Sequence, residues 1–272
     1  VLRAALVGEE ERAGVSISYV VEPERRGTAG AIRFAADELG DRLEDRFLAL
    51  NGDVLTDLDL TALLRAHTAT EGARATIALH PVADSSAYGL VRTSTSGAVE
   101  DFTEKTGEAV PGEINAGMYV LERSVLDLIP PGEEVSIERD VFPRLVGDGL
   151  YGLRLDGYWM DIGTPERYLQ ASWDILEGKV ETQVQPTAPG MLVAEGAEVG
   201  DGARIGPRVV IGPGSRLEAG AEVRESILLD GCVVGEGATI SGSILSAGVD
   251  VPAGAILDGA VLAADEGVET NA

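Results

Sequence analysis

The sequence predicts an α/β domain followed by a prism-like coil of short parallel strands. Two observations carry this prediction. Over residues 193–257 an aliphatic residue recurs at every sixth position, with small or polar residues between the repeats. Upstream of that run, apolar stretches of strand length alternate with stretches of helical length. We therefore expect a layered domain joined to a solenoid of small side chains.

The six-residue repeat predicts which side chains fill the coil. With a six-residue period, every sixth side chain points inward. There it stacks on its counterpart in the next coil. The repeat shortens by one residue before Leu228 and again before Leu245. Flat stacked faces of this kind favour self-association, so we expect a homo-oligomer formed through the coil. The repeat positions are Val193, Val199, Ile205, Ile211, Leu217, Val223, Leu228, Val234, Ile240, Leu245, Val251 and Leu257.

The α/β domain is predicted over residues 1–180 and the coil over residues 186–272, because 178–189 has no periodicity and contains Gln, Thr and Pro. The alternation of strands and helices indicates a mostly parallel sheet. Apolar periodicity predicts strands over 16–22, 47–50, 74–82 and 114–121, and helices over 29–39, 60–67, 125–129, 137–146 and 165–177.

Composition excludes several classes of function. The formal net charge of −25 argues against nucleic-acid binding, which relies on basic contacts to phosphate. A phosphate-bearing ligand must then meet a local cationic site or a metal ion. No apolar run approaches the roughly 20 residues of a membrane helix, so no membrane partner is expected. The single cysteine, Cys232, excludes an internal disulfide and favours a cytoplasmic location.

Ligands of an α/β layer collect where strands end, so residues that follow the expected strands are candidates for a site. The turn Gly27-Thr28-Ala29-Gly30 enters a helix, presents free backbone N–H groups and lets a ligand approach the main chain. A plain helix cap would also explain this turn. Asp53 follows a buried strand and a glycine, and could hold Mg²⁺ against phosphate oxygens, or form a cap or turn.

Three later motifs add polar groups. Glu104 and Lys105 would face opposite sides of a strand, where one could meet a sugar hydroxyl and the other a phosphate; a solvated edge strand is the alternative. Asn115 stands among small residues in a strand that a ligand can approach closely. Asp161 precedes a turn and a helix that Pro165 begins, and Asp53 and Asp161 could share one metal ion.

Taken in order, these motifs resemble those of the sugar-1-phosphate nucleotidyltransferases, and most closely the bacterial mannose-1-phosphate guanylyltransferases. The resemblance spans nearly the whole chain. It implies a Rossmann-like nucleotidyltransferase domain followed by a left-handed parallel β-helix of hexapeptide repeats. The matching motifs are Gly27-Thr28-Ala29-Gly30, Asn51-Gly52-Asp53, Tyr88-Gly89, Glu104-Lys105, Asn115-Ala116-Gly117 and residues 159–165.

The resemblance also implies a role for each motif. The turn Gly27-Thr28-Ala29-Gly30 would lie against the nucleotide base. Gly89, Glu104 and Asn115 would contact the sugar, and Lys105 would contact its phosphate. Asp53 and Asp161 would hold Mg²⁺, so the residues implied to be catalytic are Asp53, Lys105 and Asp161.

The implied reaction is in-line attack by a sugar 1-phosphate on the α-phosphorus of a nucleoside triphosphate, with release of pyrophosphate. Positioning and charge neutralisation would supply the catalysis. The residues of these motifs are closest to the guanylyltransferase branch of the family. The resemblance therefore favours GTP and mannose 1-phosphate as substrates, with dTTP and glucose 1-phosphate as the next choice.

The chain departs from the family in two places. Family members carry a glycine-rich loop that cradles the triphosphate, and this sequence begins at Val1 without it. We therefore expect an N-terminally incomplete chain that transfers nothing by itself. Arg26 stands where relatives often have leucine, and it either adjusts base contacts or lies in solvent.

Two other functions compete with this interpretation. Coils of this kind also form acyltransferases that use a histidine as a base, but His67 and His80 both lie in the α/β half. A non-catalytic regulatory member of the same family remains an alternative. The missing loop favours that alternative, whereas Asp53, Lys105 and Asp161 favour an enzyme.

Overall fold

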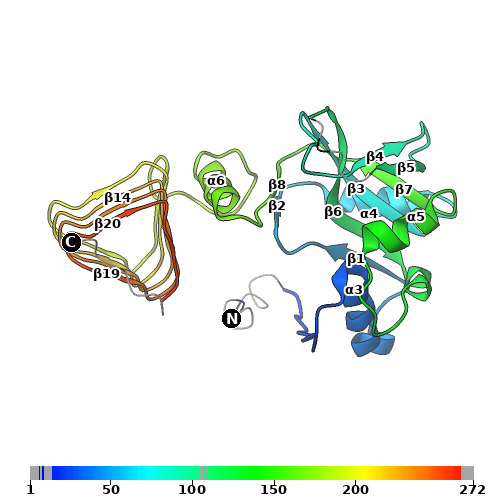
Figure 1. Cartoon of the computed structure of the whole chain (residues 1–272), viewed down its shortest axis with the longest axis horizontal. Coiled ribbons are helices and arrows are strands. Elements are labelled where there is room, and N and C mark those ends of the chain that lie inside the picture. The colour runs from blue at the N-terminus through cyan, green and yellow to red at the C-terminus, as the bar shows by residue number, and fades with distance from the viewer. Residues whose placement is uncertain (1–5, 7, 9–13, 104–106, 108, 265–272) are drawn as a thin grey trace. The chain divides into compact units, whose positions relative to one another are not determined.

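The structure is a computed structural model that describes residues 6, 8, 14–103, 107 and 109–264. The chain divides into two compact units. The first comprises Val1–Asn51 and Asp59–Asp156, and the second comprises Gly52–Leu58 and Gly157–Ala272. Figure 1 traces the chain through both units. The predicted domain limits at 180 and 186 stay a prediction.

A six-stranded sheet is the centre of the first unit. Its order is β5-β4-β6-β3-β7, and β1 also pairs with β6. The strands are β1 (Arg46–Leu50), β3 (Ala75–Val82), β4 (Leu90–Thr93), β5 (Val99–Thr103), β6 (Gly112–Glu122) and β7 (Leu150–Arg154). The expected strands at 47–50, 74–82 and 114–121 are therefore confirmed as β1, β3 and β6.

The pairing of this sheet corrects the expectation of a mostly parallel sheet. Within the described residues of this sheet, only β3 and β7 pair in parallel, while β6 pairs antiparallel with β1, β3 and β4, and β4 pairs antiparallel with β5. The cause is the position of β6, which lies between strands that all run opposite to it. The expected strand at 16–22 is also wrong, because residues 15–22 form no strand.

Helices pack on this sheet at the expected places. They are α3 (Gly27–Leu39), α4 (Leu60–Ala69) and α5 (Phe142–Leu145), with 3-10 helices at Gly40–Arg42 and Arg123–Leu128 and a π-helical turn at Ile137–Val141. Asp59 caps α4 by accepting a hydrogen bond from the N–H of Ala62 at 2.9 Å. Leu63 and His67 lie one turn apart on the buried face of α4.

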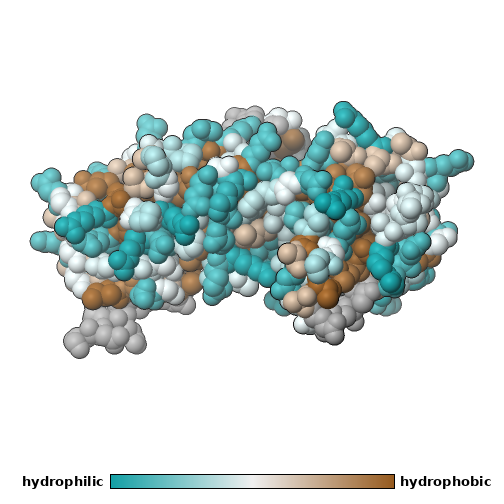
Figure 2. All heavy atoms as spheres, turned by 90° about the horizontal axis from the view of Figure 1, so that it is seen from above, coloured by the Kyte–Doolittle hydropathy of each residue, from teal (hydrophilic) through white to brown (hydrophobic). Residues whose placement is uncertain are grey.

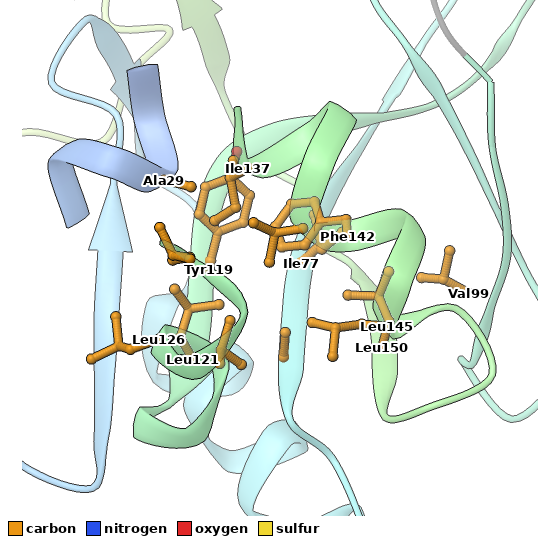
Figure 3. Packing of buried hydrophobic residues seen from close by; sticks show 14 of the residues in the cluster. Ala29, Ile77, Val99, Tyr119, Leu121, Leu126, Ile137, Phe142, Leu145 and Leu150 are labelled. Carbon is orange, nitrogen blue, oxygen red and sulfur yellow. The ribbon is translucent and has the colours of Figure 1, made fainter. Parts of the chain in front are cut away.

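The core of the first unit lies between the sheet and these helices. Phe142 is fully buried, and its ring meets that of Tyr119 edge to face with centroids 5.1 Å apart. Figure 3 shows the two rings beside Ile77 and Ile137, with Ala29 of α3 close to Tyr119. Because Ala29 and Ile137 join one core, the N-terminal turn of α3 is held against the segment that leads into α5.

The second unit begins with a two-stranded antiparallel ladder and a helix. β2 (Val54–Thr56) pairs with β8 (Trp159–Asp161), and α6 (Pro165–Leu176) follows β8. Asp57 accepts hydrogen bonds from the N–H of Tyr158 at 2.6 Å and from the N–H of Glu181 at 2.9 Å. These bonds fix the two strands to the chain that leaves α6. The expected helix at 165–177 is confirmed as α6.

A parallel β-helix of three sheets completes the second unit, as Figure 1 shows. Ile211 pairs with Val193 and Leu228, and Leu245 pairs with Leu228 and Leu262. The repeat positions therefore stack from coil to coil, and the predicted α/β and β-helix fold class is confirmed. The strands are β9 (Met191–Val193), β10 (Glu198–Val199), β11 (Arg204–Ile205), β12 (Val209–Ile211), β13 (Arg216–Leu217), β14 (Glu222–Arg224), β15 (Ile227–Leu228), β16 (Val233–Val234), β17 (Thr239–Ser241), β18 (Ile244–Leu245), β19 (Asp250–Val251), β20 (Ile256–Asp258) and β21 (Val261–Leu262).

Buried hydroxyls brace the coils from within. Ser226 and Ser243 are fully buried, and each donates to the carbonyl two residues before it at 2.7 Å. Each hydroxyl also accepts a hydrogen bond at 3.0 Å from the next coil, that of Ser226 from the N–H of Ser243 and that of Ser243 from the N–H of Ala260. Cys232 is fully buried in the same interior, as a small packed side chain.

Charged and polar side chains cover much of the face that Figure 2 shows, with apolar side chains in smaller areas between them. The predominance of hydrophilic residues accords with the net charge of −25. Across the described part of the chain, no helix has the length and apolar character that a membrane span requires.

Candidate active site

Asp53 and Asp161 are brought together by the ladder of β2 and β8. Asp161 is the register partner of Val54, and the carbonyl of Asp53 accepts a hydrogen bond from the N–H of Ile162 at 2.8 Å. A Cβ atom placed on Gly163 would lie 3.1 Å from Oδ1 of Asp161 and 3.7 Å from Oδ2 of Asp53. Both carboxylates thus face one small space. That they hold a metal ion stays a prediction.

Asp161 is held by two donors. Its Oδ1 accepts from the N–H of Gly163 at 2.9 Å, and its Oδ2 accepts from the guanidinium of Arg167 at 3.1 Å. Arg167 can reach back because it lies in the first turn of α6, which Pro165 begins and Thr164 caps with its hydroxyl. Sequence reasoning missed Arg167, since only the helix start at Pro165 was visible as a signal.

The donor set suits a hard divalent cation. Two carboxylates supply oxygen ligands, which Mg²⁺ prefers, and each carboxylate keeps lone pairs beyond those used by its hydrogen bonds. Within the described residues, no group of three or more His, Cys, Asp or Glu is arranged so that it could hold a metal ion by itself.

The turn Gly27-Thr28-Ala29-Gly30 opens α3, but part of its expectation is wrong. The N–H groups of Ala29 and Gly30, expected to be free for a ligand, both donate to the carbonyl of Val135, at 2.9 and 3.3 Å. Thr28 accepts a hydrogen bond on Oγ1 from the N–H of Ile137 at 3.0 Å. The chain's own segment around Val135 therefore occupies these groups. Contact of the turn with a nucleotide stays a prediction.

The segment at residues 133–135 passes so close to this turn that both of its glycines are required. A Cβ on Gly27, which has φ +65°, would lie 2.6 Å from the carbonyl oxygen of Val135. A Cβ on Gly30 would lie 2.6 Å from the carbonyl oxygen of Glu133. Arg26 precedes the turn, and its guanidinium lies 4.5 Å from the centroid of the Phe34 ring. Arg26 is partly exposed, and whether it adjusts contacts with a base stays a prediction.

The motif Asn115-Ala116-Gly117 forms an irregularity in β6. The register with β3 runs from Ile77 opposite Tyr119 to Leu79 opposite Asn115, so β6 has extra residues here. Gly117 has φ +75°, and a Cβ there would lie 2.8 Å from Nδ2 of Asn51. The N–H of Asn51 donates to the carbonyl of Gly117 at 2.8 Å. Two motifs far apart in the sequence therefore meet at this bulge.

Asn115 is surrounded by hydrogen bonds. Its Nδ2 donates to the hydroxyl of Tyr119 at 2.9 Å and to Oε1 of Glu138 at 2.5 Å, and its Oδ1 accepts from the N–H of Gly117 at 2.9 Å. Burial raises the pKa of Tyr119, so the phenol stays protonated. Sequence reasoning missed Glu138 because its segment was recognised only as an expected helix at 137–146.

The remaining predicted residues are placed as follows. Gly89 immediately precedes β4, whose first residue, Leu90, pairs with Ile114 of β6. Gly89 and Asn115 are therefore each adjacent in sequence to a member of this pair. Glu104 and Lys105 lie outside the described residues. Asp53 and Asp161 belong to the second unit, whereas the turn at Gly27, Gly89 and Asn115 belong to the first.

Two family models match the chain. The nucleotidyl transferase model matches residues 2–178, and the GMPPB C-terminal domain model matches residues 187–272. A mannose-1-phosphate guanylyltransferase of Mycobacterium tuberculosis is 38% identical over 234 residues, which cover 85% of this chain and 62% of that protein. A mannose-1-phosphate guanyltransferase of Schizosaccharomyces pombe is 41% identical over 171 residues, which cover 61% of this chain and 46% of that protein. The chain thus spans about half the length of the curated relatives it matches.

A solved structure shares the fold. HddC from Yersinia pseudotuberculosis matches with a TM-score of 0.53 and 25% sequence identity, over 62% of this chain and 71% of that chain. A second crystal structure of HddC was determined in complex with GMP-PN, and it matches with a TM-score of 0.52.

Proposed function

This chain belongs to the nucleotidyl transferase family, and from that premise we propose that the protein forms GDP-mannose from GTP and mannose 1-phosphate. The convergence of Asp53 and Asp161 on the space beside Gly163 carries the proposal, because two carboxylates there would suit a divalent cation, here Mg²⁺. The curated relatives named as mannose-1-phosphate guanylyltransferases support the choice of sugar and base. The GMP-PN complex of HddC supports a guanine nucleotide.

The chemistry is a transfer between phosphates. An oxygen of the sugar 1-phosphate attacks the α-phosphorus of the triphosphate, the bond from that phosphorus to the bridging oxygen breaks, and pyrophosphate leaves. A divalent cation, when bound, would neutralise phosphate charge during this exchange. Asp53 and Asp161 would hold that cation, and the hydrogen bonds to Asp161 from Gly163 and Arg167 would fix its carboxylate.

The other predicted residues complete the proposal. The turn Gly27-Thr28-Ala29-Gly30 would lie against the base, and Lys105 would contact the sugar phosphate. Gly89 and Glu104 would contact the sugar, and Asn115 would belong to the same sugar site. A chain with a net charge of −25 needs such local cationic groups to receive two phosphorylated substrates.

A homo-oligomer formed through the β-helix is also part of the proposal. Its outer coils expose aliphatic side chains, with Val199 47%, Ile256 79% and Val261 52% exposed. Sedimentation velocity of the protein tests this point, since a monomer at micromolar concentration would contradict it. A cytoplasmic location stays part of the proposal and rests on the single cysteine.

The test is a pyrophosphate-release assay on the complete gene product that contains these residues, with GTP and mannose 1-phosphate. We expect Asp53→Asn and Asp161→Asn each to lower kcat by about 100-fold or more, as loss of a metal ligand does. The control is Asp148→Asn, whose carboxylate is 68% exposed and pairs only with Arg74 among the described residues. Faster turnover with dTTP and glucose 1-phosphate would overturn the choice of substrates, and no turnover with any pair would favour a regulatory protein.

A further inference from the structure

We propose that Glu138 recognises a sugar hydroxyl in the transferase site, and that Asn115 is the residue that positions Glu138. The inference rests on the proposed function and names a sugar contact that the sequence motifs do not contain. It reverses the expected order of the two residues, because Asn115 itself was expected to contact the sugar.

The hydrogen bonds of Asn115 leave it little capacity for a ligand. A side-chain amide has two N–H donors and two acceptor lone pairs. Both donors of Asn115 are used, one by the Tyr119 hydroxyl and one by Oε1 of Glu138. One lone pair of Oδ1 is used by the N–H of Gly117. A hydroxyl that needs an acceptor would find a single lone pair on Asn115, and a hydroxyl that needs a donor would find none.

Glu138 has the capacity that Asn115 lacks. Glu138 is exposed to solvent. Within the described residues, its second carboxylate oxygen, Oε2, accepts no hydrogen bond. A carboxylate accepts through both oxygens, so Oε2 offers a charged acceptor for hydroxyl donors. Vicinal hydroxyls of a hexose are donors of that kind.

The segment that carries Glu138 is fixed in place from both sides. Ser136 caps the π-helical turn by accepting from the N–H of Arg139 at 3.3 Å, and Asp140 accepts from the N–H of Ser136 at 2.7 Å. The N–H of Ile137 donates to Thr28 of the predicted nucleotide turn. Glu138 is therefore anchored between the predicted base-binding turn and the bulge of Asn115, which is the preorganisation that a recognition residue needs.

Glu138→Gln separates direct recognition from support of Asn115. The carbonyl of the glutamine can still accept the hydrogen bond from Asn115, so the brace survives. The outer group becomes an NH₂ donor, which cannot accept from a sugar hydroxyl. If Glu138 contacts the sugar, the KM for mannose 1-phosphate rises about 10-fold or more, while the KM for GTP changes less than about 2-fold.

The control is Glu134→Gln, which removes the same charge from an exposed position on the same segment. Its two KM values are expected to equal those of the wild type. A series of deoxy analogues of mannose 1-phosphate then identifies the hydroxyl. The analogue that lacks this hydroxyl should bind the wild type more weakly than mannose 1-phosphate does, whereas Glu138→Gln should bind the two compounds equally.

The outcomes separate the two proposals. Wild-type turnover with an unchanged sugar KM in Glu138→Gln overturns the role of Glu138 and leaves the proposed function standing. A wild type that turns over no sugar 1-phosphate overturns the proposed function and this inference with it. Circular dichroism of each variant checks that the fold is retained.

Discussion

Arg167 donates a hydrogen bond of 3.1 Å to Oδ2 of Asp161, so a guanidinium is paired with one of the two carboxylates that face Gly163. The pair is partly open to solvent, with 37% of the Arg167 side chain and 35% of the Asp161 side chain exposed. A cation bound by Asp161 would therefore share that carboxylate with a fixed positive charge.

Arg167→Gln is expected to tighten cation binding in the absence of nucleotide. Removing the guanidinium removes its repulsion of a divalent ion, and solvent screening limits the gain to about 3- to 10-fold. Mn²⁺ binding followed by electron paramagnetic resonance measures the effect. The control is Arg154→Gln, whose partners Asp156 and Glu113 are not candidate ligands. Weaker binding in Arg167→Gln would mean that Arg167 orients Asp161 for the cation instead.

His67 is expected to make stability depend on pH. It is buried, its Nε2 lies 3.1 Å from Oε1 of Glu122 and its Nδ1 lies 2.8 Å from the hydroxyl of Thr76. Burial lowers the pKa of His67 in spite of the hydrogen bond to Glu122. The unfolded chain then takes up a proton before the folded chain does. The free energy of unfolding is thus highest above a pH of about 6.5. As the pH drops below that value, it decreases by at most about 1.4 kcal/mol per pH unit.

Urea unfolding at pH 7.5 and at pH 5.5 measures this loss. Burial also lowers the pKa of His80, so His80→Gln is examined alongside His67→Gln. We expect His67→Gln to reduce the difference in stability between the two pH values, because the neutral amide keeps its hydrogen bonds and does not titrate. An unchanged difference in His67→Gln would contradict the prediction.

Arg208 joins the first coils of the β-helix to α6. Its guanidinium carbon lies 5.1 Å from the centroid of the Trp173 ring, and its Nε donates to Oε1 of Glu177 at 2.7 Å. Arg208→Ala should lower the unfolding free energy of the second unit by about 1 kcal/mol and change the fluorescence of Trp173. Arg216→Ala, on the exposed side of β13, is the control. A native emission spectrum in Arg208→Ala would count against the contact.

Cys232 is expected to resist modification in the folded protein. It is fully buried in the β-helix, and burial raises the pKa of its thiol, which lowers the fraction of reactive thiolate. Reaction with an aromatic disulfide reagent should be slow in buffer and rapid in denaturant. Glu236→Cys, at an exposed position in the same coil, should add one fast-reacting thiol. Rapid labelling of the wild type in buffer would refute the prediction.

The β-helix could be predicted from the sequence because its contacts repeat locally. Val193 pairs with Ile211 and Ile211 pairs with Leu228 through a nearly constant step along the chain, so a period in the sequence becomes a column in space. The same holds for α4 and α6, whose caps and apolar positions lie within a few residues of one another. The sheet order could not be predicted in this way, since the place of β6 among its partners depends on pairings between distant segments.

The candidate site divides in the same manner. Residue types and motif order alone were enough to select Asp53, Asp161, Asn115 and the turn at Gly27. Only the tertiary structure decided what these residues touch: Arg167 on Asp161, Glu138 on Asn115, and Val135 on the N–H groups of Ala29 and Gly30. The physical reason is that a hydrogen bond depends on distances of a few ångströms between groups, and the sequence records no such distance for segments that the fold brings together.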